Sequence, residues 1–245
     1  MSTSVVRAMR ILDLLAHSDE ALTLTEIAER LSIPKSTAHG ILRDLVSESF
    51  VAVSKPTAYG IGLKAFEVGS AHLRRVGVAG IVGPELGRLT RTLGVTSHYA
   101  ILDRTDAVYL CKEDPPGLGV RLASSVGARL PSHLTAVGKA CLAWVDPLLL
   151  PEYVAAGPEP STATELATKL AAELAGIRAC GHATDAGRVA TGITCVAAPV
   201  FDPAGCRGAV GVSYLPGPGS DLEAIAGEVR TAAARTSALL GGRPA

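Results

Sequence analysis

The chain has 245 residues, of which 48% are apolar and 19% are charged, so it can build one large core or two smaller ones. This composition argues against a disordered chain, and a formal net charge of zero argues against a protein that coats nucleic acid nonspecifically. The N-terminus lacks the apolar core of a signal peptide, and no stretch approaches the roughly 18 apolar residues of a membrane span. We therefore expect a cytoplasmic protein without a membrane partner.

The cysteines are odd in number, widely spaced and absent from the first 110 residues, which indicates a reducing compartment. No CxxC pair is present, so a zinc ribbon is not expected, and we predict neither a cofactor nor a metal. The five are Cys111, Cys141, Cys180, Cys195 and Cys206.

The first predicted element is an amphipathic helix from Val5 to His17, whose apolar residues recur at three- and four-residue steps. A second, short helix begins after Thr23, because Thr23 and Glu26 have the spacing of a capping box. It ends before Pro34, since proline disfavours helical geometry in the residue that precedes it. Pro34 in turn suits the first turn of a third helix.

The third helix is followed by two short strands, Phe50–Val53 and Tyr59–Ile61, with a turn over residues 54–57. Three helices and a hairpin in about 60 residues follow the winged-helix order. We therefore predict a winged helix-turn-helix domain over residues 1–62. The predicted buried stripe of the third helix consists of Ala38, Ile41, Leu42 and Leu45.

In a helix-turn-helix domain, the first turns of the second helix of the motif contact base edges in the major groove. The exposed side of the third helix has short hydrogen-bonding groups at its tip and longer cations beside them. Free backbone N–H groups at its start can also meet a phosphate. The wing tip and the first helix add one cation each. The predicted DNA-binding residues are Arg7, Lys35, Ser36, Thr37, His39, Arg43 and Lys55.

Charge is the main argument against this prediction. Residues 1–62 contain six Lys and Arg against seven Asp and Glu, so the domain is about −1 and is not basic as many DNA binders are. DNA binding then requires Lys35, Arg43 and Lys55 to gather on one face, and a dimer or tetramer to strengthen it. Periodicity alone leaves a purely structural three-helix domain as an alternative.

Residues 63–77 are predicted to form a linker helix, and residues 78–245 a second domain. Hairpin-like strand pairs mixed with helices in this second domain favour an α+β fold built on one antiparallel sheet. The predicted helices span residues 80–93, 135–145, 164–179 and 221–240. The predicted strands span residues 96–102, 107–111, 120–124, 193–200 and 208–214.

A small-molecule site is predicted at the helix that Thr135 caps. Its first turn, Ala136-Val137-Gly138, is small enough for a ligand to approach unpaired N–H groups, which favour an anion such as a carboxylate. Close packing of this helix on the sheet is the alternative reason for the small residues. Alternation along the strand at 193–200 places Ile193 and Cys195 on one face.

Six segments then appear in a characteristic order along nearly the whole chain: RAMRILDLL at 7–15, LTEIA at 24–28, PKSTAH at 34–39, LPSH at 130–133, AVGKA at 136–140 and AAPVFD at 197–202. Together they resemble the IclR family of bacterial transcriptional regulators. The resemblance implies a winged-helix domain, a linker helix and a C-terminal GAF-like domain that binds a small effector. It also implies a homodimer or a dimer of dimers on a double-stranded DNA operator.

Effectors in this family are commonly small organic acids or aromatic catabolites. The chain departs from the family pattern at Gly40 and Gly60, where the family usually has arginine, and at Arg188 and Thr191, where glutamate is common. These changes affect the expected operator and ligand. By resemblance, the effector-binding residues are Ala136, Val137, Asp185, Ile193, Cys195 and Ser213.

Two other functions stay open. A thiol-based redox sensor needs a reactive cysteine near a cation, and Cys206 beside Arg207 is the only suggestive pair. An enzyme would need a metal or Cys–His site, and no HExxH, GxSxG or P-loop pattern supports one. Its candidate residues are His98, His133, His182, Asp185 and Cys195.

Overall fold

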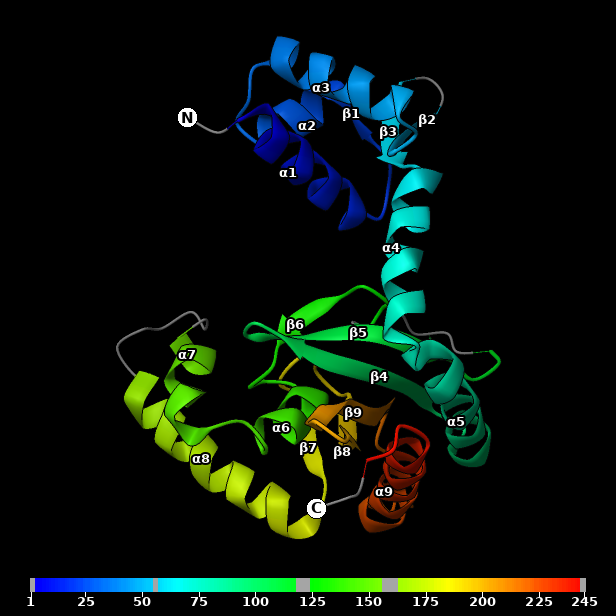
Figure 1. Ribbon diagram of the computed structural model, residues 1–245, viewed down its shortest axis with the longest axis vertical. Helices are drawn as coiled ribbons and strands as arrows, with labels where there is room; N and C mark the ends of the chain where they lie inside the picture. The colour runs from blue at the N-terminus through cyan, green and yellow to red at the C-terminus, as the bar shows by residue number, and fades with distance from the viewer. Residues whose placement is uncertain (1–2, 55–56, 118–123, 156–162, 243–245) are drawn as a thin grey trace. The chain divides into compact units, whose positions relative to one another are not determined.

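The computed structural model describes residues 3–54, 57–117, 124–155 and 163–242 (Figure 1). The chain divides into two compact units, residues 1–76 and 77–245. The predicted linker, residues 63–77, therefore groups almost entirely with the first unit. Among the described residues, no helix combines the length and the hydropathy that a bilayer crossing requires.

The described residues of the first unit form four helices and a three-stranded antiparallel sheet in the order β1-β3-β2. The predicted elements are present. The sheet also contains a strand, β1, that was not predicted, because two residues are too few to show the alternation of a strand. The elements are α1 (Ser4–Ala16), β1 (Leu22–Thr23), α2 (Leu24–Arg30), α3 (Lys35–Ser47), β2 (Val51–Ser54), β3 (Ala58–Ile61) and α4 (Leu63–Val76).

A capping box at the start of α2 holds the helix-turn-helix in place. The Thr23 hydroxyl accepts the Glu26 N–H at 3.3 Å, and the Glu26 carboxylate accepts the Thr23 N–H at 2.7 Å. These two bonds satisfy donors that a helix start otherwise leaves unpaired. One apolar cluster then joins α1, α2, α3 and the sheet through Ile11, Ile27 and Leu42, each fully buried.

The described residues of the second unit build a six-stranded antiparallel sheet in the order β6-β5-β4-β9-β8-β7. This arrangement confirms the predicted α+β, GAF-like class. The strands are β4 (Thr96–Asp103), β5 (Asp106–Glu113), β6 (Arg129–Pro131), β7 (Ala183–Ala186), β8 (Thr194–Asp202) and β9 (Gly205–Tyr214).

Helices cover both faces of this sheet (Figure 1). Helices α5 and α9 pack on one face and contact each other, while α6 packs on the other face with α8 beside it. Alternation along β8 decides the two faces, since Ala197 belongs to the cluster under α6 and its neighbours Val196 and Ala198 do not. The helices are α5 (Val78–Leu93), α6 (Ala136–Leu142), α7 (Leu150–Ala155), α8 (Ala163–Cys180) and α9 (Leu222–Leu239).

Some predicted boundaries were wrong. Helix α6 ends at Leu142 instead of at 145, because the chain tightens there into a turn in which Trp144 N–H bonds to Cys141 O at 3.0 Å. Asp146 then caps a short 3₁₀ helix, Pro147–Leu149. The short elements β6, β7 and α7 were not predicted. The strand predicted over 120–124 lies almost wholly outside the described residues.

Candidate nucleic-acid interface and small-molecule pocket

The N-terminal tip of α3 is exposed on the first unit. Lys35, Ser36 and His39 are exposed and Thr37 is half-buried, whereas Ala38 and Leu42 on the opposite side of the helix are completely buried. The buried residues fix the rotation of α3 about its axis. This rotation places the predicted DNA-binding residues at the start of the helix on its solvent-exposed side. The tip is therefore available to a partner of this unit.

The start of α3 also offers unpaired backbone donors. Pro34 occupies the N-cap position and supplies no side-chain hydrogen bond, so the first N–H groups of this 13-residue helix are uncapped. Uncapped N–H groups together with the helix dipole favour a bound anion such as a phosphate. A polar, uncapped helix start at the surface suits contact with a nucleic-acid backbone.

Two of the three cations that the prediction places on one face, Lys35 and Arg43, lie on α3. Arg43 lies on α3 with Ser36 and His39, but its guanidinium pairs with the neighbouring Asp44 at 3.3 Å. Arg7 lies on a different helix, α1, and is half-buried. Lys55 lies outside the described residues. DNA contacts by these residues remain predictions.

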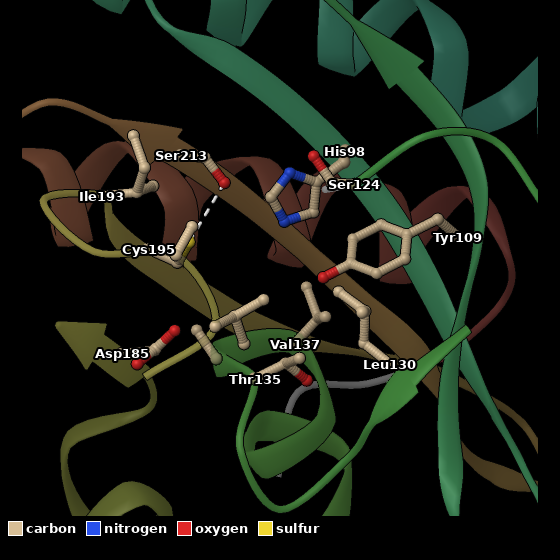
Figure 2. A pocket seen from close by; sticks show the side chains of 13 residues that line it. His98, Tyr109, Ser124, Leu130, Thr135, Val137, Asp185, Ile193, Cys195 and Ser213 are labelled. Carbon is tan, nitrogen blue, oxygen red and sulfur yellow. Dashed lines mark hydrogen bonds between the residues drawn. The ribbon is translucent and has the colours of Figure 1, made fainter. Parts of the chain in front are cut away.

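A pocket in the second unit lies between the first turn of α6 and the sheet (Figure 2). Its empty space, open solvent at the mouth included, is about 420 Å³. The side chains that line it are His98, Tyr109, Ser124, Leu130, Thr135, Ala136, Val137, Asp185, Val189, Ala190, Ile193, Cys195 and Ser213.

All six residues predicted to bind an effector line this pocket. Ala136 and Val137 come from α6, Asp185 from β7, and Cys195 from β8. Ile193 precedes β8 by one residue and Ser213 lies on β9. The structure brings these residues together from five segments, and their contact with an effector stays a prediction.

One end of the pocket contains a buried carboxylate. Asp185 is 3% exposed, and its Oδ1 accepts the Arg188 N–H at 3.0 Å, which leaves further acceptor capacity on the carboxylate. Cys195 lies close to it in Figure 2, and its Sγ is 3.1 Å from the Ser213 hydroxyl. Burial raises the pKa of the Cys195 thiol to about 11, so the thiol stays protonated.

The other end contains three polar residues outside the predicted effector-binding set: His98, Tyr109 and Ser124. The rings of His98 and Tyr109 meet edge to face at 5.2 Å. Burial, with Lys112 nearby, lowers the pKa of His98 to about 3, so the imidazole is neutral at physiological pH. His98 Nδ1 and Ser124 Oγ are buried and have no hydrogen-bond partner among the described residues. Such atoms are available to a ligand.

The first turn of α6, which forms one wall of the pocket, supplies backbone donors. Thr135 Oγ1 accepts the Gly138 N–H at 3.0 Å, whereas no bond to the N–H groups of Ala136 or Val137 occurs within the described residues. Two glycines bring α6 close to its neighbours. A Cβ on Gly138 would collide with the backbone of Ser132, and one on Gly211 would lie 3.0 Å from Val137 Cγ1. The small residues thus serve close packing and ligand access together.

Lys139 connects α6 to α8 and β7. Its side chain is buried, and its Nζ donates to Glu173 Oε1 at 2.5 Å on α8 and to Thr184 O at 2.6 Å on β7. Thr184 precedes Asp185, so the position of the pocket carboxylate is tied to α6. Lys139 was recognised in the sequence only as part of a motif, because its partners lie 34 and 45 residues away.

Of the five residues proposed for an enzyme, His98, Asp185 and Cys195 line the pocket, whereas His133 and His182 do not. His182 is bonded to Arg230 at 3.0 Å. Among the described residues, no group of three or more His, Cys, Asp or Glu could hold a metal. A protonated Cys195 is also a poor nucleophile.

Comparison with known proteins gives two family matches. Residues 4–59 match the model of the IclR helix-turn-helix domain, and residues 70–238 match that of the bacterial transcriptional regulator IclR C-terminal domain. The chain is also similar to the HTH-type transcriptional regulator BhcR of Paracoccus denitrificans. The two are 38% identical over 212 residues, which cover 84% of this chain and 75% of the relative.

Solved structures agree over almost the entire chain. An IclR transcriptional regulator from Alicyclobacillus acidocaldarius is 29% identical with a TM-score of 0.78, and the match covers 99% of this chain and 100% of that one. An IclR homolog from Microbacterium hydrocarbonoxydans, complexed with 4-hydroxybenzoate, has a TM-score of 0.81 at 21% identity. That match covers 97% of this chain and 99% of the other.

Proposed function

Because this chain belongs to the IclR family of bacterial transcriptional regulators, we propose that it binds an operator in double-stranded DNA through α3 and that a small effector in the α6 pocket controls this binding. The observation that carries the proposal is the exposed, uncapped start of α3. Polar side chains there reach base edges, and the free N–H groups meet a phosphate. A regulator of bacterial genes works in the cytoplasm.

The pocket supports an effector that combines an acid with a hydroxyl group. An aromatic or small organic acid can place its carboxylate at the N–H groups of Ala136 and Val137. The lining given by the described residues contains no Lys or Arg, so backbone dipoles would have to stabilise this charge. A hydroxyl at the other end of the ligand would donate to Asp185. The homolog with bound 4-hydroxybenzoate is consistent with such a ligand.

We further propose that the protein works as a homodimer or a dimer of dimers. The first unit exposes large apolar side chains on two helices, Val5 and Met9 on α1 and Leu63 and Phe66 on α4, each at least 59% exposed. Exposed apolar groups of this size commonly mark protein interfaces. Two copies would also double the few phosphate contacts that a domain of charge about −1 can make.

Genome-wide mapping of bound DNA followed by gel-shift titration tests the DNA part. We expect the double variant Ser36→Ala, Arg43→Ala to bind the mapped site at least 10-fold more weakly, since one lost base contact costs about 1–3 kcal/mol. Arg91→Ala is the control, because it removes an exposed cation from the second unit. Equal affinity of the double variant and the wild type would contradict the proposed reading face.

The effector part is tested with Cys195→Phe, which fills the pocket. We expect this variant to bind operator DNA normally and to lose its response to the metabolites of the mapped genes. Cys180→Phe is the matched control, since Cys180 is exposed and outside the pocket. A normal response in the Cys195 variant would exclude this pocket as the effector site.

A further inference from the structure

A second cavity lies at the opposite end of α6 from the effector pocket. Its empty space is about 770 Å³, open solvent included, and the C-terminal end of α6 and the turn between β8 and β9 form its walls. It is lined by Ile101, Leu102, Cys141, Trp144, Val145, Ala204, Gly205, Cys206, Arg207 and Gly208. The proposed DNA and effector functions make no use of this cavity.

Two cysteines face each other across its wall. Cys141 is buried on α6, Cys206 is half-buried on β9, and both pack in the same apolar cluster. The two thiols line the same cavity and interact with each other, and the Cys206 thiol also donates to Gly208 O at 3.5 Å. The two cysteines lie 65 positions apart in the sequence, so the sequence alone did not indicate this pair and offered only Arg207 as a partner for Cys206.

The chemistry of the two thiols is unequal. Accepting a hydrogen bond from Cys141 lowers the pKa of Cys206, because the bond stabilises its thiolate. The same bond, with burial, raises the pKa of Cys141. Arg207, which lines the same cavity, adds a cation nearby, although it also approaches Asp202 at 3.8 Å. Cys206 is therefore the better nucleophile of the pair.

The other cysteines lack such an arrangement. Cys195 contacts the hydroxyl of Ser213, and Cys180 is exposed with its thiol bonded to His182 O at 3.2 Å. Burial raises the pKa of the Cys111 thiol. Within the described residues, the contact between Cys141 and Cys206 is the one that joins two thiols at a cavity.

We propose that Cys141 and Cys206 form a reversible intramolecular disulfide in response to a peroxide that enters this cavity. The Cys206 thiolate attacks one oxygen of the peroxide, the O–O bond breaks, and hydroxide or an alkoxide leaves to give a sulfenic acid. The Cys141 thiol then attacks the sulfenic sulfur, loses its proton and expels water. The two thiols lose two electrons, and the peroxide is reduced by two.

The bridge would act on α6. A disulfide brings two sulfurs to about 2.05 Å, which is shorter than any non-bonded approach of two sulfur atoms. The C-terminal end of α6 would therefore move toward β9. Since the first turn of the same helix lines the effector pocket, oxidation would also change that pocket.

Peptide mapping of the full-length protein, with and without hydrogen peroxide, tests the proposal. Trypsin and chymotrypsin separate all five cysteines, because chymotrypsin cuts at Phe201 between Cys195 and Cys206. We expect a linked peptide that contains Cys141 and Cys206, the loss of two of five titratable thiols, and recovery of both with dithiothreitol. Trp144 is the only tryptophan and lines the cavity, so its fluorescence should change at the same rate.

Serine variants supply the controls. Cys206→Ser and Cys141→Ser should each abolish the linked peptide and the fluorescence change, while Cys180→Ser, at an exposed thiol, should keep both. If a serine variant fails to fold, the wild-type peptide map decides alone. Oxidation that stops at single cysteines, links two chains, or pairs other cysteines would overturn the proposal. The peptide map does not depend on operator or effector binding, so a failure of either binding proposal would not overturn the proposed disulfide.

Discussion

Acid should destabilise the second unit through His98. This side chain is 1% exposed, and burial lowers its pKa to about 3, against about 6.5 in an unfolded chain. Between these two values the unfolded state binds a proton that the folded state does not. Stability is therefore fully present above about pH 6.5 and is lost as the pH falls below it.

The size of the effect follows from these two pKa values. Between pH 7.5 and pH 5.5, proton binding to the unfolded His98 lowers the free energy of unfolding by about 1.4 kcal/mol. The loss would continue at about 1.4 kcal/mol per pH unit down to about pH 3. His133, whose pKa burial also lowers, adds a smaller effect of the same sign.

Urea unfolding at the two pH values measures this effect, with Trp144 fluorescence as the probe because this single tryptophan lies in the second unit. His98→Gln should remove most of the difference, since glutamine does not titrate, whereas His133→Gln should remove little. If the wild type and His98→Gln lose the same stability between pH 7.5 and 5.5, the neutral buried imidazole is refuted.

Three substitutions test the packing around α6 and the capping of α2. Gly138→Ala should cost about 1–3 kcal/mol in urea unfolding, because its Cβ meets the Ser132 backbone, while Gly176→Ala on the open face of α8 should stabilise by up to about 1 kcal/mol. Lys139→Met should cost about 2 kcal/mol or more by the same assay, since it strips Glu173 and Thr184 O of their donor; the exposed pair at Lys169 gives the control Lys169→Met, expected to stay within about 0.5 kcal/mol. Thr23→Ala should lower the stability of the first unit by about 1 kcal/mol in thermal unfolding followed by circular dichroism, and an equal loss in Thr25→Ala, at a residue without a capping role, would contradict the capping argument.

Local signals explain why the first unit was predictable. The capping box at Thr23, the proline at position 34 and the apolar stripe of α3 each act within a few residues, so each can be recognised in the sequence. The strand β1 was not predicted, because two residues are too few to show alternation. The bond between Lys139 and Glu173 could not be predicted because it is not local: the two residues meet only when α6 packs against α8.

The pocket residues also differ in whether a local sequence pattern could predict them. Ile193 and Cys195 were placed on one face by strand alternation, and the remaining predicted residues came from the family resemblance. His98 and Tyr109 were not predicted as lining residues, because a single histidine or tyrosine in a strand has no local pattern that marks it. Only the sheet order, which places β4 between β5 and β9, brings them opposite Cys195 and Ser213.

The burial of α6 decides how a ligand can act on it. Every one of its seven residues is buried, so its side chains have no free space in which to rearrange alone. A ligand that displaces the first turn must therefore move the helix as a body. Lys139 would then carry Glu173 on α8 and Thr184 on β7 with it, because a buried ammonium cannot give up its partners without a large cost. A displacement of α6 by a ligand would thus reach two further elements through one side chain.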